Sequence, residues 1–384
     1  GKVLGLMLSA GLVGMALGSF LLAPLADRWG RRPMIVCCLL ILTSGMALSA
    51  LAANAWQLGA LRVYTGIGIG GMLAGVGVIT AEYANAKWRS TAVALQATGY
   101  PIGATAGGLL AAWMLEHWSW HSVFLIGAGA SLLCIPLVLK CLPESLDFLV
   151  ARRPANALPR LNALLSRMRM PELQALPPAP VRDGQRQGYA ALFVGDLRRV
   201  ALLIALAFFL HMFAFYFVLS WTPKLLVSAG VSAQQGITGG VLLNLGGIVG
   251  GSLFGWLASR WSLSKLTAGA LLLAMVSMLG FAAFNTQLGM AFPLAFVIGA
   301  ALFAAMAGLY AAAPVVFAAQ VRTTGLGWAI GIGRVGAILS PLTVGVLVDG
   351  HWRPSALYVL CALPLLLAAW ACLGLRVGVG RNQR

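Results

Sequence analysis

Residues 25–32 read Leu-Ala-Asp-Arg-Trp-Gly-Arg-Arg, a charged stretch that separates two long apolar runs. Its charged residues are Asp27, Arg28, Arg31 and Arg32. A partial copy, Leu-Ala-Ser-Arg-Trp-Ser, occupies residues 257–262, where Arg260 follows Arg28 by 232 positions. The copy carries Ser259 in place of the acidic residue, so we expect the two copies to differ in the contacts they make by charge.

A second pair of copies supports this repeat. Trp88-Arg89-Ser90-Thr91 resembles Val321-Arg322-Thr323-Thr324, and Arg322 follows Arg89 by 233 positions. Two pairs with almost the same separation indicate a chain built from two related halves. If the second half opens near Arg198, the same separation predicts that about one helix and a loop precede Gly1.

The composition indicates a protein that crosses a membrane many times. Hydrophobic residues make up 60% of the 384 residues and charged residues only 9%, against about 25% in soluble domains. The mean hydropathy is +0.90 and the net charge is +17. The basic residues lie in connections between apolar runs, which indicates a membrane topology rather than nucleic-acid binding. We expect no cofactor and no metal.

The apolar runs are each long enough to cross a bilayer as a helix. We expect spans near 4–26, 34–53, 57–80, 90–114, 120–140, 198–221, 234–258, 266–285, 288–312, 324–347 and 354–375. A membrane barrel is excluded because its strands would show alternation over about ten residues. Glycine-rich faces at 66–71 and 239–251 predict close helix packing. The fold class is therefore all-α and polytopic.

The charges also predict orientation and domains. Lys and Arg are concentrated in alternate connections, which the positive-inside rule places in the cytoplasm together with the C-terminus. The expected parts are an N-terminal half at 1–140, a cytoplasmic loop at 141–197, a C-terminal half at 198–375 and a tail at 376–384. Within the loop we expect one amphipathic helix around 155–168, a flexible remainder, and contact of its basic residues with anionic lipid headgroups.

Several motifs resemble the major facilitator superfamily, and within it the aromatic acid:proton symporters. They are Asp27-Arg28-Trp29-Gly30-Arg31-Arg32; Arg62-x-x-x-Gly66-x-Gly68-x-Gly70-Gly71 with Glu82-Tyr83 and Arg89-Ser90; Gly99-Tyr100-Pro101-x-Gly103; Trp120-His121-x-Val123-Phe124; Leu142-Pro143-Glu144-Ser145-Leu146-x-Phe148-Leu149; and Arg322-x-Thr324-Gly325-x-Gly327-Trp328-x-x-Gly331-x-Gly333-Arg334-x-Gly336. The resemblance implies two six-helix halves with the first helix absent, so that 11 helices remain. It also implies that an Asp-rich motif for substrate and proton coupling belongs to that absent helix.

Two arginines are the leading candidates for substrate binding. Arg62 and Arg334 lie inside predicted spans, where a charge is costly and usually faces a substrate or ion pathway. A guanidinium binds both oxygens of a carboxylate, so the pair favours an organic anion. Polar or aromatic residues expected at membrane depth complete the candidate set: His211, Tyr216, Trp221, Asn244 and Tyr310. Each has a structural alternative, such as an interfacial belt for Trp221 or helix packing for Tyr310 and His211.

A second group of residues is expected to gate access from the cytoplasm. It comprises Asp27, Arg28, Gly30, Arg31, Arg32, Glu82, Arg89, Arg260 and Arg322. Opposite charges at helix ends can hold the two halves in one state and release them in another. The alternative is a solvated loop that follows the positive-inside rule, which explains the arginines but leaves Asp27 unexplained.

The favoured function is proton-coupled uptake of an aromatic carboxylic acid across the bacterial inner membrane, by a monomer. A drug or metabolite:proton antiporter of the same fold is the alternative, although intramembrane arginines suit a cationic drug badly. A non-transporting fragment also remains open. A membrane enzyme is disfavoured because the chain has nine acidic residues and no HExxH motif.

Overall fold

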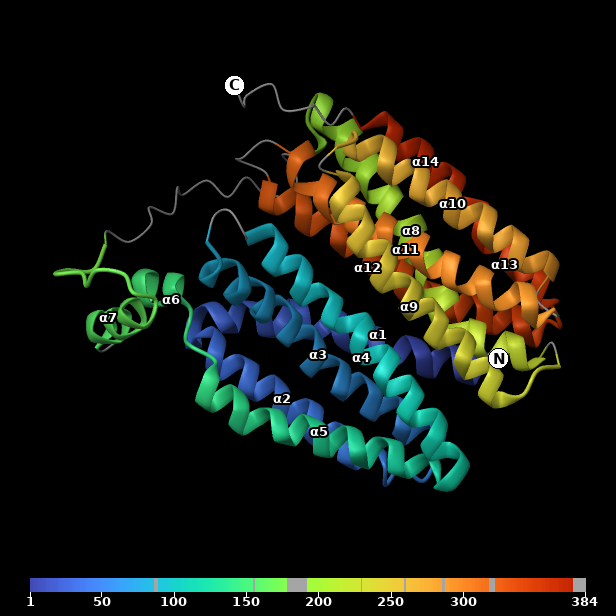
Figure 1. Cartoon of the computed structure of the whole chain (residues 1–384), viewed down its shortest axis with the longest axis horizontal. Coiled ribbons are helices and arrows are strands. Elements are labelled where there is room, and N and C mark those ends of the chain that lie inside the picture. The colour runs from blue at the N-terminus through green and yellow to red at the C-terminus, as the bar shows by residue number, and fades with distance from the viewer. Residues whose placement is uncertain are drawn as a thin grey trace. The chain divides into compact units, whose positions relative to one another are not determined.

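The computed structural model describes residues 1–85, 89–154, 156–177, 192–228, 230–258, 260–284, 287–317 and 322–375. Over these residues the regular structure is helical (Figure 1). The helices are α1 (Lys2–Trp29), α2 (Arg31–Ser49), α3 (Ala55–Tyr83), α4 (Arg89–His117), α5 (Trp120–Cys141), α6 (Leu146–Arg152), α7 (Ala157–Arg167), α8 (Asp196–Ser228), α9 (Ala233–Ala258), α10 (Leu263–Phe284), α11 (Leu288–Val316), α12 (Arg322–Asp349), α13 (Pro354–Ala362) and α14 (Pro364–Gly374). The predicted all-α fold is confirmed.

The predicted spans correspond to individual long helices. Among the described residues, 10 helical stretches are long and apolar enough to cross a membrane, and the last of them joins α13 and α14. The span predicted at 90–114 is the 29-residue helix α4, which is not one of the ten. Its middle is rich in Gly, Thr and Ala, so it is less apolar than its length suggests. The chain is a multi-pass membrane protein.

Glycines allow some of these helices to pack at backbone distance, as their spacing predicts. A Cβ built on Gly66 of α3 would collide with the main-chain oxygen of Gly11 in α1. A Cβ on Gly246 of α9 would collide with the main-chain oxygen of Phe296 in α11. Small residues at such contacts let membrane helices approach closely.

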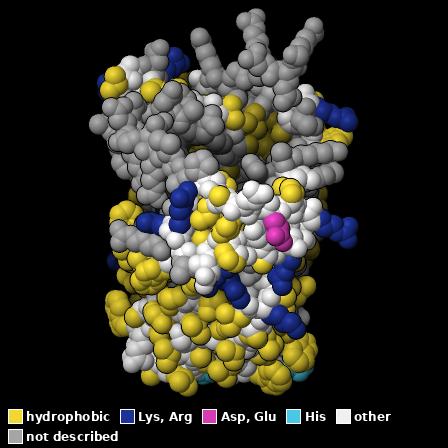
Figure 2. All heavy atoms as spheres, turned by 90° about the vertical axis from the view of Figure 1, so that its left-hand side faces the viewer, with side chains coloured by type: hydrophobic (Ala, Val, Ile, Leu, Met, Phe, Trp, Pro, Cys, Tyr) yellow, Lys and Arg dark blue, Asp and Glu magenta, His cyan; other side chains and the backbone are white. Residues whose placement is uncertain are grey.

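The outward faces of the spans are apolar. On α5 the side chains of Leu125, Leu132, Leu133 and Leu137 are all more than half exposed. Figure 2 shows hydrophobic side chains over much of the surface in that view. A soluble monomer rarely exposes a patch of this extent, so the surface is suited to lipid.

The segment between α5 and α8 contains more structure than the sequence predicts. The amphipathic helix expected around 155–168 is confirmed as α7, and a second short helix, α6, precedes it. The Ser145 side chain caps α6 by accepting a hydrogen bond from the Phe148 amide at 3.1 Å, a common way to satisfy a helix N-terminus. Residues 178–191, part of the expected tether, lie outside the described residues.

The chain divides into two compact units. Unit 1 consists of Gly1–Ser9, Thr98–Glu116 and Gln185–Arg384, and unit 2 consists of Ala10–Ala97 and His117–Gly184. In unit 1, α9 packs against α11 and α12 packs against α8; in unit 2, α2 packs against α3 and α5. The halves predicted at 1–140 and 198–375 stay a prediction.

Candidate functional site

Unit 1 brings Arg334 together with tyrosines from three other helices. The half-buried Arg334 side chain lies in the middle of α12, and its Nη1 donates to the Tyr216 hydroxyl of α8 at 3.5 Å. Tyr100 of α4 and Tyr310 of α11 both interact electrostatically with the Arg334 guanidinium. We call Tyr100, Tyr216, Tyr310 and Arg334 the Arg334 cluster.

The Arg334 cluster has the chemistry of an anion site. Over the described residues, Arg334 forms no ion pair with a carboxylate. Its contact with Tyr216 is at the outer limit of hydrogen-bond length, so most of its donor capacity remains open. A guanidinium has five N–H donors in a planar fork, and the phenol hydroxyls add groups that can donate or accept.

Tyr100 is the member of this cluster that sequence reasoning missed. Its side chain is 51% exposed, and it also interacts electrostatically with Tyr216. The motif Gly99-Tyr100-Pro101 was visible in the sequence, but nothing in that motif places it beside a residue of α12. Only the packing of the helices in unit 1 does so.

Tyr310 and Asn244 also lie in unit 1. The Tyr310 ring packs edge-to-face on Phe208, with the ring centroids 5.3 Å apart. The Asn244 amide donates to the main-chain oxygen of Gly240 at 2.9 Å. Its side-chain oxygen is buried, and no described residue hydrogen-bonds to it. An amide oxygen of this kind can accept a hydrogen bond from a ligand hydroxyl.

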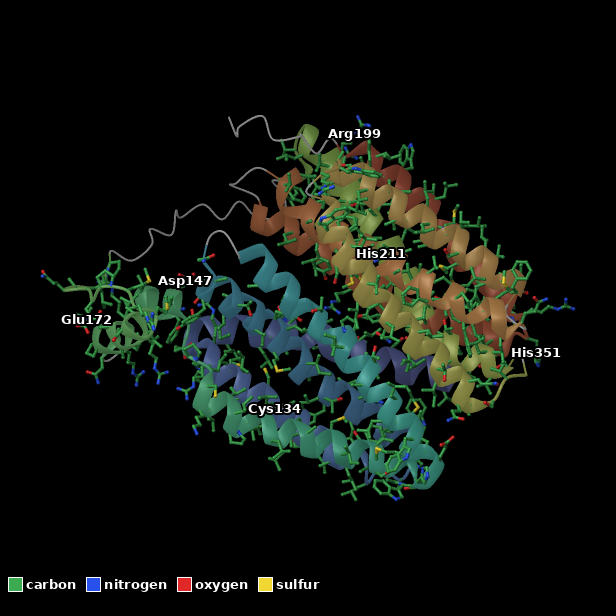
Figure 3. The ribbon with its side chains drawn as sticks, in the orientation of Figure 1. Cys134, Asp147, Glu172, Arg199, His211 and His351 are labelled. Carbon is green, nitrogen blue, oxygen red and sulfur yellow. The ribbon has the colours of Figure 1, made fainter. Side chains whose placement is uncertain are left out.

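His211 and Trp221 are enclosed in the interior of unit 1. Both are fully buried on α8 (Figure 3 labels His211), and their ring nitrogens have no hydrogen-bond partner among the described residues. The His211 ring lies 5.7 Å from Phe215, centroid to centroid. Lys224 lies over the Trp221 ring at 5.5 Å. Their predicted substrate contacts stay a prediction.

Arg62 belongs to unit 2. It lies on α3, and its guanidinium stands over the Phe124 ring of α5 at 5.1 Å from the centroid. The side chain is exposed, and the described residues supply it with no carboxylate partner. A cation over an aromatic face is a modest attraction, so Arg62 keeps its hydrogen-bonding capacity for another partner.

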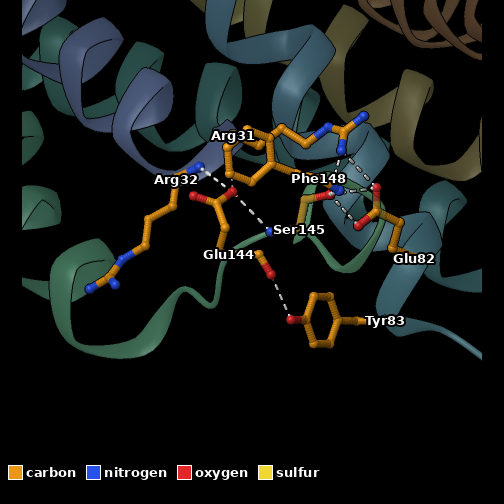
Figure 4. A network of polar contacts seen from close by, with 7 residues as sticks. All are labelled: Arg31, Arg32, Glu82, Tyr83, Glu144, Ser145 and Phe148. Carbon is orange, nitrogen blue, oxygen red and sulfur yellow. Dashed lines mark hydrogen bonds and ion pairs between the residues drawn. The ribbon is translucent and has the colours of Figure 1, made fainter. Parts of the chain in front are cut away.

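A polar network joins the α1–α2 turn to the start of α6, all within unit 2 (Figure 4). The Glu144 carboxylate accepts the main-chain N–H groups of Arg31 and Arg32 at 2.8 and 3.2 Å, and that of Ser145 at 2.9 Å. Because Arg31 is the first residue of α2, Glu144 caps this helix from 112 or more positions away. A carboxylate at a helix N-terminus is stabilised by open N–H donors and by the helix dipole.

Gly30 is required where this cap is formed. Its φ is +106° and its ψ is +150°, a combination that is nearly confined to glycine. A Cβ on Gly30 would lie 2.5 Å from the second carboxylate oxygen of Glu144. Both the backbone conformation and the close approach therefore exclude a side chain.

The second part of the network is centred on Ser145. Its hydroxyl lies 2.9 and 2.7 Å from the two Glu82 carboxylate oxygens, and Arg31 forms an ion pair with Glu82 at 3.2 Å. The Arg31 guanidinium also donates to the Ser145 hydroxyl. The predicted gate residues Gly30, Arg31, Arg32 and Glu82 are thus brought together. Glu144 and Ser145 were not predicted to join them.

Tyr83 closes the network on the α3 side. Its hydroxyl donates to the main-chain oxygen of Glu144 at 2.7 Å. Burial, and then the nearby charges of Glu82 and Glu144, raise the pKa of the Tyr83 hydroxyl to about 12. The phenol therefore stays protonated and can donate this hydrogen bond at physiological pH. We call Gly30, Arg31, Arg32, Glu82, Tyr83, Glu144 and Ser145 the Glu144 network.

Other predicted gate residues are placed only in part. The side chains of Asp27, Arg28, Arg89 and Arg322 lie outside the described residues, although their helices α1, α4 and α12 are described. Arg260 is exposed, and its guanidinium lies over the Trp256 ring at 4.3 Å from the centroid.

Comparison with known proteins identifies the family. The sequence profile of the Major Facilitator Superfamily matches residues 1–341. The gallate transporter of Pseudomonas putida is 32% identical over 381 residues, covering 96% of this chain and 82% of that protein. The 4-hydroxybenzoate transporter PcaK of Acinetobacter baylyi is 29% identical over 376 residues, covering 96% and 81%.

The fold is also found among solved structures. The xylose transporter XylE of Escherichia coli, in a partially occluded inward-open conformation, has a TM-score of 0.74 and 16% identity. The match covers 100% of this chain and 89% of XylE, and at this identity it shows the fold alone. The resemblance to aromatic acid transporters that the motifs suggested is confirmed, and the chain belongs to the major facilitator superfamily.

Proposed function

We propose that the chain is a secondary transporter that couples uptake of an aromatic carboxylate to proton movement across the bacterial inner membrane. The observation that carries this proposal is the Arg334 cluster, a guanidinium within a span with phenol hydroxyls around it and no carboxylate partner among the described residues. The gallate and 4-hydroxybenzoate transporters support the substrate class, because each named substrate carries a carboxylate on a hydroxylated ring.

The proposed binding mode follows from the donors available. The fork of Arg334 takes the two carboxylate oxygens, a geometry that lysine cannot reproduce. Tyr100, Tyr216 and Tyr310 offer hydroxyls to the ligand, and their rings provide aromatic faces. The unpaired oxygen of Asn244 accepts from a ring hydroxyl. Arg62, which has no carboxylate partner among the described residues, stays a predicted substrate residue of unit 2.

The Glu144 network is proposed to control access. It ties the ends of α2 and α3 to the link before α6 by charge-assisted hydrogen bonds, which are roughly twice as strong as neutral ones. Alternating access requires such ties to hold in one state and to rearrange in another. The positive-inside rule assigns this end, and the C-terminus, to the cytoplasm.

The transport proposal is tested by uptake into cells that express the open reading frame encoding this chain. Labelled benzoate, 4-hydroxybenzoate and gallate are compared with labelled xylose and a cationic dye, each with and without a protonophore. We expect uptake of at least one aromatic acid and its loss when the proton gradient is collapsed. Uptake that is indifferent to the protonophore would exclude proton coupling, and export of the dye alone would favour the antiporter alternative.

The site assignment is tested by two substitutions of Arg334. Loss of a hydrogen bond to a charged group costs about 1.5–3 kcal/mol, so we expect Arg334→Ala to raise the half-saturating substrate concentration by roughly 10- to 150-fold. The half-saturating concentration of Arg334→Lys should lie between those of the parent chain and Arg334→Ala, because lysine keeps the charge and lacks the planar fork of donors. The exposed Arg353→Ala is the matched control. Unchanged uptake by Arg334→Ala, with normal expression, would refute the assignment.

A further inference from the structure

The segment that follows the Glu144 network is a folded basic unit rather than a plain connection. It comprises α6, α7 and the chain to Pro177, and we call residues 146–177 the α6–α7 module. Helix α6 packs against α7, and Leu149, Ala157 and Leu161 are buried in the module. In Figure 1 the two helices lie together at one end of the unit 2 spans α2 and α5.

Two hydrogen-bonded clamps hold the chain after α7 onto the helices. The Asn162 side chain donates to the main-chain oxygen of Leu173 and accepts from its N–H, both at 3.0 Å. The Arg153 guanidinium donates to the main-chain oxygen of Pro177 at 2.7 Å. These contacts hold the main chain at Leu173 and Pro177 against the two helices, so the module is a folded unit.

That surface is basic. The module contains five arginines, Arg152, Arg153, Arg160, Arg167 and Arg169, and two acidic residues, Asp147 and Glu172. Figure 2 shows several Lys and Arg side chains on the side of the molecule that faces left in Figure 1. Figure 3 labels the two acidic residues of the module. Arg160, Arg167 and Arg169 are exposed, and within the described part of the chain they form no ion pair.

Helix α7 is amphipathic, and two of its arginines lie on one side of it. Arg160 and Arg167 are seven residues apart, so they lie on the same side of the helix. Leu164, between them on that side, is half-buried, and the exposed Met170 follows Arg169. Basic side chains at the edge of an apolar stripe are the arrangement found in helices that lie at a bilayer surface.

The module is held close to the bilayer. Helix α5 ends at Cys141, and α6 begins at Leu146, so these two helix ends are at most about 18 Å apart. Glu144 and Ser145 within that link are themselves bonded to the ends of α2 and α3. The short link therefore keeps this basic surface near the end of the span α5.

We propose that the α6–α7 module binds the anionic phosphate headgroups of the bilayer through Arg160, Arg167 and Arg169. The occupant is a lipid surface, because the charge is complementary and the tether is short. The leaflet would be the cytoplasmic one, which rests on the orientation proposed above. It assigns to the module a role in seating the Glu144 network on the membrane.

The test is hydrogen–deuterium exchange of α7 in the full chain, reconstituted in phosphatidylcholine vesicles with or without phosphatidylglycerol. We expect slower exchange of residues 157–170 in the anionic vesicles, and less slowing at high salt. An arginine near an anionic surface contributes about fivefold to binding. The double variant R160Q/R167Q should therefore weaken binding about 25-fold and abolish the slowing, R160K/R167K should keep it, and the control R353Q should behave as the parent chain.

Three outcomes would overturn the proposal. Equal exchange in the two lipid compositions excludes headgroup binding. If exchange of residues 157–170 is still slowed by anionic lipid in R160Q/R167Q, residues other than these arginines bind the headgroups. Slowing produced by free glycerol phosphate in phosphatidylcholine vesicles excludes a lipid surface as the required occupant. Uptake by the same vesicles separates this test from that of the transport function, since Arg334→Ala should lose uptake and keep the lipid-dependent slowing.

Discussion

Replacing Gly30 by alanine should destabilise the Glu144 network more than its size suggests. The backbone there has φ +106° and ψ +150°, and holding a residue with a side chain in such a conformation costs of order 1–3 kcal/mol. The new Cβ would also lie 2.5 Å from the Glu144 carboxylate. Moving that carboxylate weakens its hydrogen bonds to Arg31 and Arg32, each worth about 1.5–3 kcal/mol as a bond to a charged group.

The expected sum is a loss of roughly 2–5 kcal/mol in the stability of this end of unit 2. The measurement is the unfolding temperature of the purified chain in detergent, together with its rate of substrate uptake in vesicles. We expect both to fall. The matched control is Gly59→Ala in α3, where a Cβ meets nothing within 4 Å. Alanine in a helix is favoured over glycine by roughly 0.5–1 kcal/mol, so the control should be unchanged or more stable.

A double-mutant cycle separates the two causes of the loss. In a Glu144→Ala background the collision is absent, so Gly30→Ala should cost less there than in the parent chain. An equal cost in both backgrounds would refute the contribution of the collision and leave only the backbone strain. A Gly30→Ala variant as stable as Gly59→Ala would refute the reasoning altogether.

Three further predictions concern single side chains. Tyr100→Phe removes a hydroxyl beside Arg334, and we expect weaker uptake of hydroxylated aromatic acids with benzoate less affected; an equal change for both would argue against a hydroxyl contact. Ser145→Ala removes the α6 cap and the donor to Glu82, which should lower the unfolding temperature by the equivalent of about 1 kcal/mol, whereas the exposed Ser166→Ala should not. Since the folded-state pKa of Tyr83 is raised to about 12 from 10, its stabilising contribution is present below pH 10 and lost as the pH rises towards 12. The difference in unfolding temperature between the parent chain and Tyr83→Phe should therefore be constant below pH 10 and shrink above it.

The membrane spans were predictable because the thickness of a bilayer sets a minimum length for the apolar helices that cross it. A run of about 20 apolar residues has few alternatives to a membrane helix, so the helices were located from composition. Helix α6 was not predicted because its seven residues are too few to show the periodic spacing of apolar residues that marks a helix. The helical spacing of apolar residues in α7 was recognisable because its 11 residues cover three turns of helix.

The sites were less predictable because their partners are distant in sequence. Arg334 and Arg62 were selected as candidates because a charge inside a span is costly and therefore informative. Glu144 stands in a motif of the resemblance, but its role was not predicted because it depends on the N–H groups of Arg31 and Arg32, more than 110 positions away. Tyr100 stands in a motif of the resemblance, but nothing in that motif assigned it to a site beside Arg334. Tertiary packing alone distinguishes it.

The two copies of the charged stretch are now seen to be held differently. In the first copy, Arg31 is paired with Glu82, bonded to Ser145 and anchored through its amide by Glu144. In the second copy, Arg260 is exposed, lies over the Trp256 ring of the preceding helix α9, and pairs with no acid within the described residues. The two copies are therefore similar in sequence but differ in their contacts. The first turn is bonded to two other segments, the end of α3 and the link before α6. The contact described for Arg260 is worth only about 0.5–1 kcal/mol at an exposed site. Within unit 2, the first copy therefore supplies the charge-assisted contacts on which the proposed control of access rests.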